Sequence, residues 1–325
     1  MSKAETLYGE DCVSGARRHL KTGCVDLLIT DPPYGIDGHL LHKHYNRNEG
    51  MVLDGYVEVP ASEYERFSKD WIAEAARVLR PGGSMYIVSG YTNLAHILNA
   101  LRATDLVEVN HLIWKYNFGV FTKKKYVSSH YHILFWRKPG KPVVFNTHAR
   151  FSDSERALEG GSLNYRDRED VWVINREYKP GEVKNKNELP TELLVKMIQY
   201  SSRPGDLVCD FFLGGFSTAK VAIGLGRRAV GFEISKKAFD HHVKEMATLK
   251  PGYLLKGLRK PPKNLLTRGG KSVSKAEIQA VKKAYRVLAG KGATKKAALA
   301  KLSLKFKRGY WSLLRIVDGT TNKSR

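Results

Sequence analysis

Short apolar runs alternate with amphipathic stretches along most of the chain. The runs have the length of buried strands, and the stretches between them carry apolar residues at helical spacing. The predicted strands are residues 6–9, 24–30, 85–88, 106–114, 130–136, 207–210 and 229–232. The predicted helices are residues 13–20, 62–79, 94–102, 191–201 and 217–225. This alternation predicts an α/β domain over residues 1–250, with a sheet covered by helices on both faces.

Two long segments interrupt this alternation. Residues 35–60 are rich in Gly, Asn and His, and a loop of this length inside a compact domain is typical of a lid or binding loop. Residues 139–187 are polar, with only brief apolar stretches. We expect this second segment to be irregular.

The sequence from Pro251 onward predicts a small helical domain, residues 251–325. Ser274 and Glu277 have the spacing of a capping box ahead of an apolar-periodic helix. Two shorter helices are predicted at residues 294–302 and 310–317, with a turn near residues 303–309. This pair is a candidate helix-turn-helix, although its spacing alone is a weak signal.

Charge is concentrated in the same tail. The chain has 325 residues and a formal net charge of +23, and from Pro251 onward it contains 20 basic and 2 acidic residues. Such a segment favours a polyanionic partner, and nucleic acid is favoured over a membrane because no broad apolar face accompanies the charge. The alternative is a tail that only improves solubility. Residues 115–126 combine lysines with aromatic residues and also suit a nucleic-acid-facing loop.

Composition restricts the remaining possibilities. With 42% hydrophobic residues the chain is globular. No apolar run reaches the length of a membrane span and the N-terminus has no signal-peptide pattern, so we expect a cytoplasmic protein. The cysteines Cys12, Cys24 and Cys209 form no Cys-x-x-Cys pair, which argues against a zinc site and a disulfide framework.

The first candidate site is Asp31-Pro32-Pro33-Tyr34, which directly follows the predicted strand 24–30. Open α/β sheets bind ligands at the carboxyl ends of their strands. Two prolines give a stiff exit from the sheet, so that the Asp31 carboxylate and the Pro32 carbonyl could accept hydrogen bonds from an exocyclic amine of a nucleobase. Tyr34 could stack on the base. The alternative is a simple strand-ending turn.

The second candidate site lies between residues 207 and 233. A strand ending at Asp210 is followed by a turn with Gly214 and Gly215, a helix that Ser217 or Thr218 is placed to cap, and a strand ending before Glu233. This order is typical of a nucleoside-binding half of a Rossmann-like sheet, in which the final acid accepts from ribose hydroxyls. No Gly-x-Gly-x-x-Gly is present, so a cofactor without a pyrophosphate fits better. The alternative is an ordinary βαβ unit.

Residues 5–245 resemble the amino-methylating DNA methyltransferases that use S-adenosylmethionine, in the motif order called the β class. Members carry Asp-Pro-Pro-Tyr and a cofactor turn that usually reads Asp-Pro-Phe-Ala-Gly-Ser-Gly-Thr-Thr. In this chain Asp210, Phe212, Gly214 and Thr218 match that turn, while Phe211 replaces Pro and Gly215-Phe216 replaces Ser-Gly. Phe216 is the departure that most affects the expected backbone geometry.

The resemblance implies a role for each matched residue. The catalytic residues would be Asp31, Pro32, Pro33 and Tyr34. The cofactor would be bound by Asp210, Phe212, Gly214, Gly215, Thr218 and Glu233, with Lys186, Asn187 and Leu189 from a segment ahead of the helix at 191–201. Asp11 is a further candidate, because a carboxylate there could accept from a cofactor amine or cap the following helix, and capping is the commoner role.

The function expected from this resemblance is site-specific methylation of adenine N6 in double-stranded DNA, with S-adenosylhomocysteine as product and no metal. Arg150, Arg156, Arg166 and Arg168 in the segment 139–187 are candidate base-reading side chains. An initial Asp in the tetrapeptide favours adenine N6 over cytosine N4 in this family. Cytosine-N4 methylation and a catalytically silent DNA-binding protein on the same fold are the alternatives, no membrane partner is expected, and a homodimer is left open.

Overall fold

A computed structural model of the chain describes residues 5–35, 59–117, 123–147, 162–177, 188–257 and 273–319. The chain divides into two compact units, Met1–Arg259 and Lys260–Arg325. Residues 251–257 belong to the first unit, where the backbone N–H groups of Gly252 and Leu254 donate to carbonyls of the helix that ends at Gly224. The division therefore falls several residues after the Pro251 boundary expected from composition.

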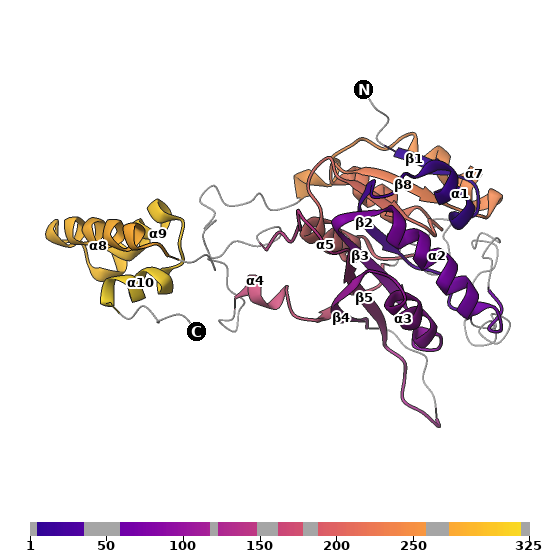
Figure 1. Ribbon diagram of the computed structural model, residues 1–325, viewed down its shortest axis with the longest axis horizontal. Helices are drawn as coiled ribbons and strands as arrows, with labels where there is room; N and C mark the ends of the chain where they lie inside the picture. Colours follow the sequence, from indigo (N-terminus) through magenta and orange to yellow (C-terminus); the bar gives the residue numbers. More distant parts are fainter. Residues whose placement is uncertain are drawn as a thin grey trace. The chain divides into compact units, whose positions relative to one another are not determined.

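The described residues of the first unit form one mixed sheet of eight strands, in the order β1-β8-β7-β2-β3-β5-β4-β6 (Figure 1). The strands are β1 (Glu5–Tyr8), β2 (Val25–Thr30), β3 (Leu79–Ser89), β4 (Val107–Lys115), β5 (His130–Arg137), β6 (Val171–Val173), β7 (Leu207–Asp210) and β8 (Arg228–Phe232). The five strands from β1 to β3 in this order are parallel neighbours, whereas β5 runs antiparallel to both β3 and β4. The carboxyl ends of β2, β7 and β8 therefore meet at one edge of the sheet.

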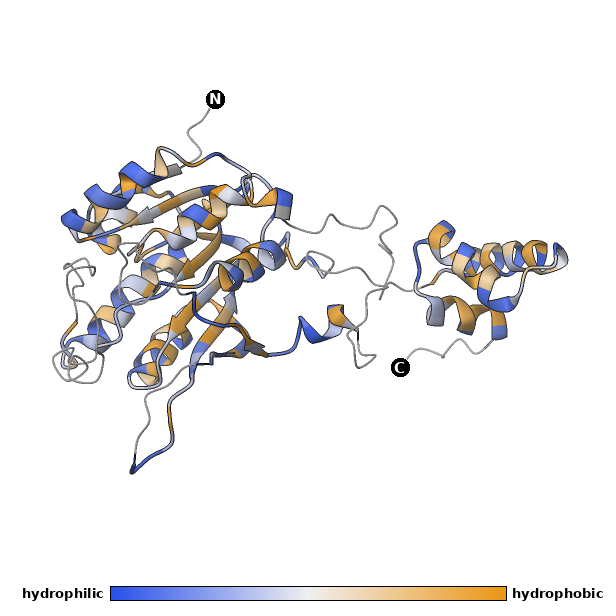
Figure 2. Cartoon of the chain, turned by 180° about the vertical axis from the view of Figure 1, so that it is seen from behind, coloured by the Kyte–Doolittle hydropathy of each residue, from blue (hydrophilic) through white to orange (hydrophobic). Residues whose placement is uncertain are grey.

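Helices cover both faces of this sheet, as the alternating pattern predicted. The helices of the first unit are α1 (Cys12–His19), α2 (Tyr64–Val78), α3 (Leu94–Arg102), α4 (Leu163–Arg166), α5 (Thr191–Ser201), α6 (Ser217–Gly224), α7 (Lys236–Met246) and the 3₁₀ helix η4 (Leu255–Gly257). Buried side chains of α1, α2 and α3 form one core with the sheet, and those of α5 and α6 form a second core on the opposite face. Figure 2 shows orange, hydrophobic segments in the strands at the middle of the sheet.

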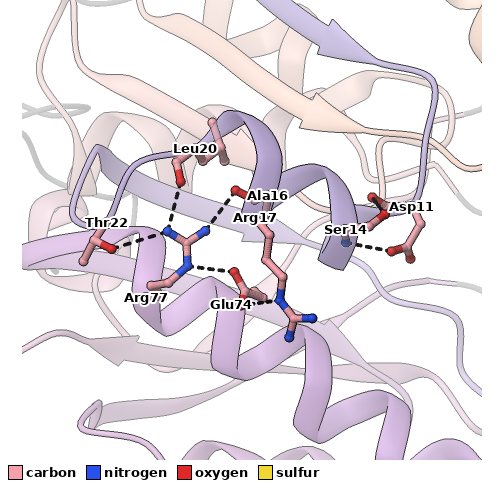
Figure 3. Close-up of polar contacts among 8 residues, drawn as sticks. All are labelled: Asp11, Ser14, Ala16, Arg17, Leu20, Thr22, Glu74 and Arg77. Carbon is pink, nitrogen blue, oxygen red and sulfur yellow. Dashed lines mark hydrogen bonds and ion pairs between the residues drawn. The ribbon is translucent and has the colours of Figure 1, made fainter.

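Polar contacts join α1 to α2 and fix the start of β2. Arg77 of α2 donates to the carbonyls of Ala16 and Leu20, each at 2.9 Å, and to Glu74 at 2.7 Å (Figure 3). The carbonyl of Leu20, the residue that ends α1, has no intrahelical partner, so Arg77 satisfies it. The Ala16 carbonyl also accepts from the Leu20 N–H at 3.0 Å. Arg17 donates to the other oxygen of Glu74 at 2.9 Å. These contacts hold α1 and α2 together beside the strand that carries the tetrapeptide.

Two local expectations differ from the structure. The predicted strand 85–88 belongs to an 11-residue strand that begins at Leu79. Arg80-Pro81-Gly82-Gly83 stays in this strand at a register shift against β2, where Gly82 and Gly83 exchange backbone hydrogen bonds with Lys138, the residue after β5. The segment 139–187 is not wholly irregular, since β6 adds a short parallel edge strand beside β4.

The second unit contains α8 (Lys275–Gly290), α9 (Lys295–Phe306) and α10 (Tyr310–Asp318). The Ser274 hydroxyl accepts from the N–H of Glu277 at 3.2 Å and caps α8 as predicted. Helix α9 runs four residues further than expected, so the connection to α10 is only Lys307, Arg308 and Gly309.

Within the described ranges, no helix combines the length and apolar composition that crossing a membrane would require.

Candidate active site

The tetrapeptide and the glycine turn follow neighbouring parallel strands. Asp31 comes directly after β2, and Asp210 is the last residue of β7, with Leu28 of β2 in register with Cys209 of β7. The Thr30 hydroxyl donates to Asp210 Oδ1 at 2.8 Å, which ties the two strand ends together. The two motifs, about 180 residues apart in sequence, therefore lie at the same point of the sheet edge.

Two side chains from the helical layer hold the backbone of the tetrapeptide. The Tyr64 hydroxyl donates to the Pro33 carbonyl at 2.7 Å, and Asn93 Nδ2 donates to the Tyr34 carbonyl at 2.6 Å. In the described part of the chain no donor reaches the Pro32 carbonyl. That carbonyl is thus a rigid acceptor in a turn in which the Pro33 and Tyr34 carbonyls are already bonded.

Asp31 and Tyr34 form a hydrogen-bonded pair within the turn. The Tyr34 hydroxyl donates to Asp31 Oδ1 at 2.6 Å. Burial raises the pKa of the Asp31 carboxyl to about 7, the Tyr34 hydrogen bond opposes this rise, and the nearby Asp210 adds to it. A carboxyl with a pKa near neutrality can both accept and release a proton at physiological pH.

Aromatic side chains and one arginine continue from Tyr34 along the sheet. The Tyr131 ring of β5 lies 5.6 Å from the Tyr34 ring, and the Trp114 and Tyr116 rings lie 5.5 and 5.4 Å from that of Tyr131. Arg176 donates to the Tyr131 hydroxyl at 2.8 Å, and its guanidinium lies 4.9 Å from the centre of the Tyr116 ring. Its positive charge also lowers the pKa of Asp31. We name Trp114, Tyr116, Tyr131 and Arg176 the aromatic cluster.

The glycine turn is built around two carboxylates. Glu233 follows β8, and its oxygens accept from the N–H groups of Gly214 at 2.8 Å and Ser235 at 2.7 Å. Burial raises the pKa of Glu233 above its ordinary value. Glycine at position 215 lets the Glu188 carboxylate approach the turn closely, and a Cβ there would make the Glu188 side chain move. The turn thus presents small residues and negative charge.

Asp210 lies beneath this turn. Its Oδ1 accepts from the N–H of Phe212 at 3.0 Å as well as from Thr30, and Thr218 donates to the same carboxyl group. Burial raises the pKa of Asp210 to about 7, and these hydrogen bonds oppose the rise. The Phe212 ring packs edge-on against Trp71 at 5.4 Å, so it anchors the turn to α2.

The prediction that Ser217 or Thr218 caps α6 is wrong. Phe216 is the N-cap, with φ 62° and ψ 19°, and no side chain caps the helix. The physical reason is that the Thr218 side chain bonds Asp210 instead. Phe216 has a left-handed backbone, which glycine adopts without cost, and its ring is fully buried beside Phe239 and His242.

The remaining sequence candidates have varied positions. Asp11 caps α1 by accepting from the N–H of Ser14 at 2.9 Å, the commoner of its two expected roles. Leu189 is buried in the core on the α5 face. Lys186 and Asn187 lie outside the described residues, as do Arg150 and Arg156. Of the other candidate arginines, Arg166 and Arg168 belong to or follow α4 and are exposed.

Several residues at the site were not found from the sequence. Tyr64 and Asn93 lie in or beside ordinary amphipathic helices, so nothing local distinguishes them. Tyr131 lies on the same strand face as the core residues Ile133 and Phe135, and Arg176 follows the edge strand β6. Neither position is distinctive in the sequence, so only the fold brings these side chains near the tetrapeptide. Glu188 is the residue that the sequence could have indicated, because its neighbours Asn187 and Leu189 were already expected to contact the cofactor.

Two other features lie away from this site. A cavity of about 200 Å³ is lined by residues of α4, β6 and α5 and includes none of the motif residues. In the parts of the chain that are described, His241, His242 and Glu245 of α7 could together ligate a metal ion, and Glu245 already pairs with Lys220 at 2.6 Å.

Comparison with known proteins identifies the class. The DNA methylase family profile matches residues 25–245. DNA adenine methyltransferase YhdJ from Escherichia coli (strain K12) is 31% identical over 254 residues, which cover 73% of this chain and 80% of that protein. A similar solved structure is that of a putative DNA modification methylase from Thermus thermophilus in complex with S-adenosyl-L-methionine. Its sequence is 23% identical to this chain and the TM-score is 0.53; the match covers 75% of this chain and 93% of that chain. The structure of the cytosine-N4-specific PvuII DNA methyltransferase is 14% identical in sequence, with a TM-score of 0.55. This match covers 72% of this chain and 83% of that chain.

The chain therefore belongs to the N6/N4 amino-DNA methyltransferase family, as its motifs predicted. This makes it an S-adenosylmethionine-dependent DNA methyltransferase whose target is an exocyclic amine, on adenine or on cytosine.

Proposed function

We propose that the enzyme methylates N6 of an adenine that is flipped out of duplex DNA. The observation that carries this proposal is the Asp31 carboxylate at the tip of β2, bonded to Tyr34 and adjacent to the glycine turn after β7. The 31% identity to a DNA adenine methyltransferase supports adenine as the target.

In this proposal the tetrapeptide prepares the amine. The lone pair of an aromatic amine is delocalised into the ring, so the amine is a poor nucleophile until acceptors orient its hydrogens. Asp31 and the Pro32 carbonyl each accept one N–H, and Asp31 takes up the proton that the methylated amine releases. Because its pKa is raised to about 7, Asp31 can then pass this proton to water.

Tyr34 and Tyr131, whose rings are only partly buried, hold the flipped base. Extracting a base from a duplex costs a few kcal/mol, and stacking on an aromatic ring returns about 1–3 kcal/mol per base. Tyr34 and Tyr131 offer two ring faces close to Asp31. Arg176 fixes the Tyr131 ring by its hydrogen bond to the hydroxyl.

The residues around the glycine turn fit S-adenosylmethionine. When bound, this cofactor supplies a methyl group on a positively charged sulfonium, and it also carries a cationic amine and ribose hydroxyls. Glu233 retains lone pairs for the hydroxyls beyond its two backbone donors, and Gly214 leaves its backbone open to close approach. Glu188, Asp31 and Asp210 add negative charge near the same turn, which favours a cationic ligand.

Identification of the methylated nucleoside tests the target base. Duplex DNA is incubated with donor carrying a deuterated methyl group, digested to nucleosides and analysed by mass spectrometry. We expect labelled N6-methyladenine from the wild type and from Asp105→Ala, a control that removes an exposed carboxylate 3.7 Å from Lys138, and none from Asp31→Ala. Labelled N4-methylcytosine in place of N6-methyladenine would contradict the proposal and identify cytosine as the target base.

The left-handed Phe216 is the observation that favours a second candidate, a catalytically silent DNA-binding protein. The family usually has glycine at this position of the cofactor turn, and a bulky residue there restricts its backbone. Titration calorimetry with S-adenosylmethionine separates the two candidates. We expect saturable binding; heat that stays at the level of dilution at high micromolar donor would favour the silent protein.

A further inference from the structure

The second unit lies outside the family match, and its three helices share one small core. Helices α8, α9 and α10 each contribute to it, through the buried residues Val281, Leu299, Leu302, Leu313 and Ile316. The unit therefore has the organisation of an independent trihelical module, separate from the methyltransferase sheet.

The turn between α9 and α10 is held rigidly against α8. Arg308 is 3% exposed and donates from Nε and Nη2 to the two oxygens of Glu277, both at 2.8 Å. Lys307 closes α9 with a left-handed backbone, φ 53°. A three-residue turn that contains glycine and joins two helices packed on a third matches the helix-turn-helix arrangement. The direction of α10 is thus fixed by a buried bidentate ion pair.

The surface of the unit is strongly cationic. Residues 273–319 contain twelve Lys and Arg and only two acids. Both acids are engaged within the unit, Glu277 with Arg308 and Asp318 with Lys295 at 2.7 Å. The other ten cations therefore have no acid of their own unit left to neutralise them, which favours a polyanionic partner.

One face of α10 is built for contact. Leu313 and Ile316 point into the core, whereas Trp311 and Arg315, four positions apart, are exposed on the opposite side. Trp311 is 72% exposed, while the other four tryptophans of the chain, Trp71, Trp114, Trp136 and Trp172, are at most 8% exposed. The Trp311 ring contacts the Tyr310 ring at 5.5 Å. An exposed tryptophan one helical turn from an exposed arginine suits stacking and phosphate contacts with nucleic acid.

We propose that α10 is the DNA-contacting helix of this unit, that Trp311 enters a groove of duplex DNA, and that Arg315 and the lysines of α9 contact its phosphate backbone. The inference goes beyond the proposed function, because it concerns a site that the methyl-transfer chemistry does not use. A membrane fits less well, since among the described residues of α10 Trp311 is the only exposed large apolar one. A second copy of the chain is disfavoured because two such cationic surfaces repel each other.

The fluorescence of Trp311 can be used to test this proposal in the full-length protein. Acrylamide quenching of tryptophan fluorescence reports mainly on this exposed side chain, and Trp311→Phe identifies its contribution. We expect a saturating duplex of about 30 base pairs to lower the quenching constant severalfold, with DNA binding confirmed independently by anisotropy. An unchanged quenching constant on fully bound DNA would overturn the proposal.

The same measurement separates the other occupants. Protection by anionic phospholipid vesicles but not by DNA would assign the face to a membrane. Protection that grows with protein concentration in the absence of DNA would assign it to a second copy. Either result overturns the proposal, and neither depends on whether the enzyme methylates adenine.

A pair of charge-matched variants locates the contact. Arg315→Gln and Lys283→Gln each remove one exposed cation, the first from α10 and the second from α8. We expect Arg315→Gln to reduce the salt slope of DNA binding by about 0.9, the contribution of one phosphate contact, and to raise the Michaelis constant for DNA with kcat unchanged. Equal effects of both variants would show a diffuse cationic surface and contradict a role specific to α10.

Discussion

The two units of this protein use charged residues in opposite ways. In the sheet unit the functional charges are carboxyl groups at strand ends, and burial raises the pKa of both Asp31 and Asp210. In the helical unit the charges are exposed lysines and arginines, and the only buried cation within its described residues, Arg308, is fully paired. Residues 1–250 contain 35 basic and 30 acidic residues, so most of the charge excess lies in the tail.

We interpret this difference as a division of tasks, in which the sheet unit carries out methyl transfer and the helical unit contributes affinity for DNA. Orienting an amine needs a few acceptors fixed in a poorly solvated place, which only a large core can supply. Attraction to a phosphate backbone needs only exposed cations, which a small module can carry. We therefore expect variants of the sheet unit to change the rate of methyl transfer, and variants of the helical unit to change DNA affinity and its dependence on salt.

The largest effect is expected from Asp31→Asn. The amide keeps the shape of the side chain but cannot take up the proton, so the single-turnover rate of methyl transfer should fall by about 10²–10⁴. Donor and DNA affinities, measured by calorimetry and anisotropy, should change little. A rate within a few-fold of the wild type would remove Asp31 from the mechanism.

Removal of residues 260–325 should have the next largest effect, on DNA binding alone. Losing several phosphate contacts should weaken affinity by about 10²–10³ near physiological salt and flatten the plot of log K against log salt concentration. Donor affinity should persist, because the glycine turn belongs to the sheet unit. An unchanged salt slope would place the DNA contacts elsewhere.

Phe216 offers a smaller effect that concerns stability. Phe216→Ala loses a buried ring, at a cost of about 3–5 kcal/mol. Phe216→Gly loses the same ring but relieves the left-handed backbone, which should return about 1 kcal/mol. We therefore expect the glycine variant to be the more stable of the two in urea unfolding; the reverse order would show that φ 62° stores no strain.

The smallest effect is a shift in pH dependence. Methyl transfer needs ionised Asp31, so the rate should fall as pH drops through about 7, the raised pKa of that carboxyl. Arg176 lowers this pKa by its positive charge, so Arg176→Gln should move the acidic limb to higher pH and leave the rate well above that limb nearly unchanged. Arg102→Gln, which removes an exposed guanidinium from the last turn of α3, is the control. A shift of equal size in that variant would argue against a local effect of Arg176.

Buried carboxyl groups also make the stability of the fold depend on pH. The rate of methyl transfer should rise with pH, whereas stability should fall. In the folded cofactor-free protein Asp31 and Asp210 have raised pKa values, so between about pH 4 and 7 the folded state binds more protons than the unfolded state. Stability of that form should therefore decrease as pH rises through this window. The ionised forms of Asp31 and Asp210 thus lower the free energy of unfolding, and Asp31 is active in its ionised form.

Much of this arrangement could be predicted from the sequence. The strands that carry Asp31 and Asp210 are short apolar runs ending in a carboxylate, which is a local signal, and the motifs themselves pointed to the family. The strand order was not predictable in the same way, because β2 pairs with β7 across about 180 residues of intervening chain.

The supporting residues depend on that long-range pairing. Tyr64, Asn93, Tyr131 and Arg176 reach the tetrapeptide from four separate segments, and none of them has a distinctive local pattern. The N-cap of α6 was mispredicted for a related reason. Thr218 has the local chemistry of a capping residue, but Asp210, from the preceding strand, binds its side chain.

A crystal structure of the full chain with S-adenosylmethionine tests the central claim most directly. The claim is that the end of β2 and the glycine turn after β7 share one site for donor and base. We predict that the donor lies against Gly214 with its ribose on Glu233 and its methyl group directed toward Asp31. A donor bound elsewhere, for example in the cavity between α4, β6 and α5, or with its methyl group directed away from Asp31, would contradict the account.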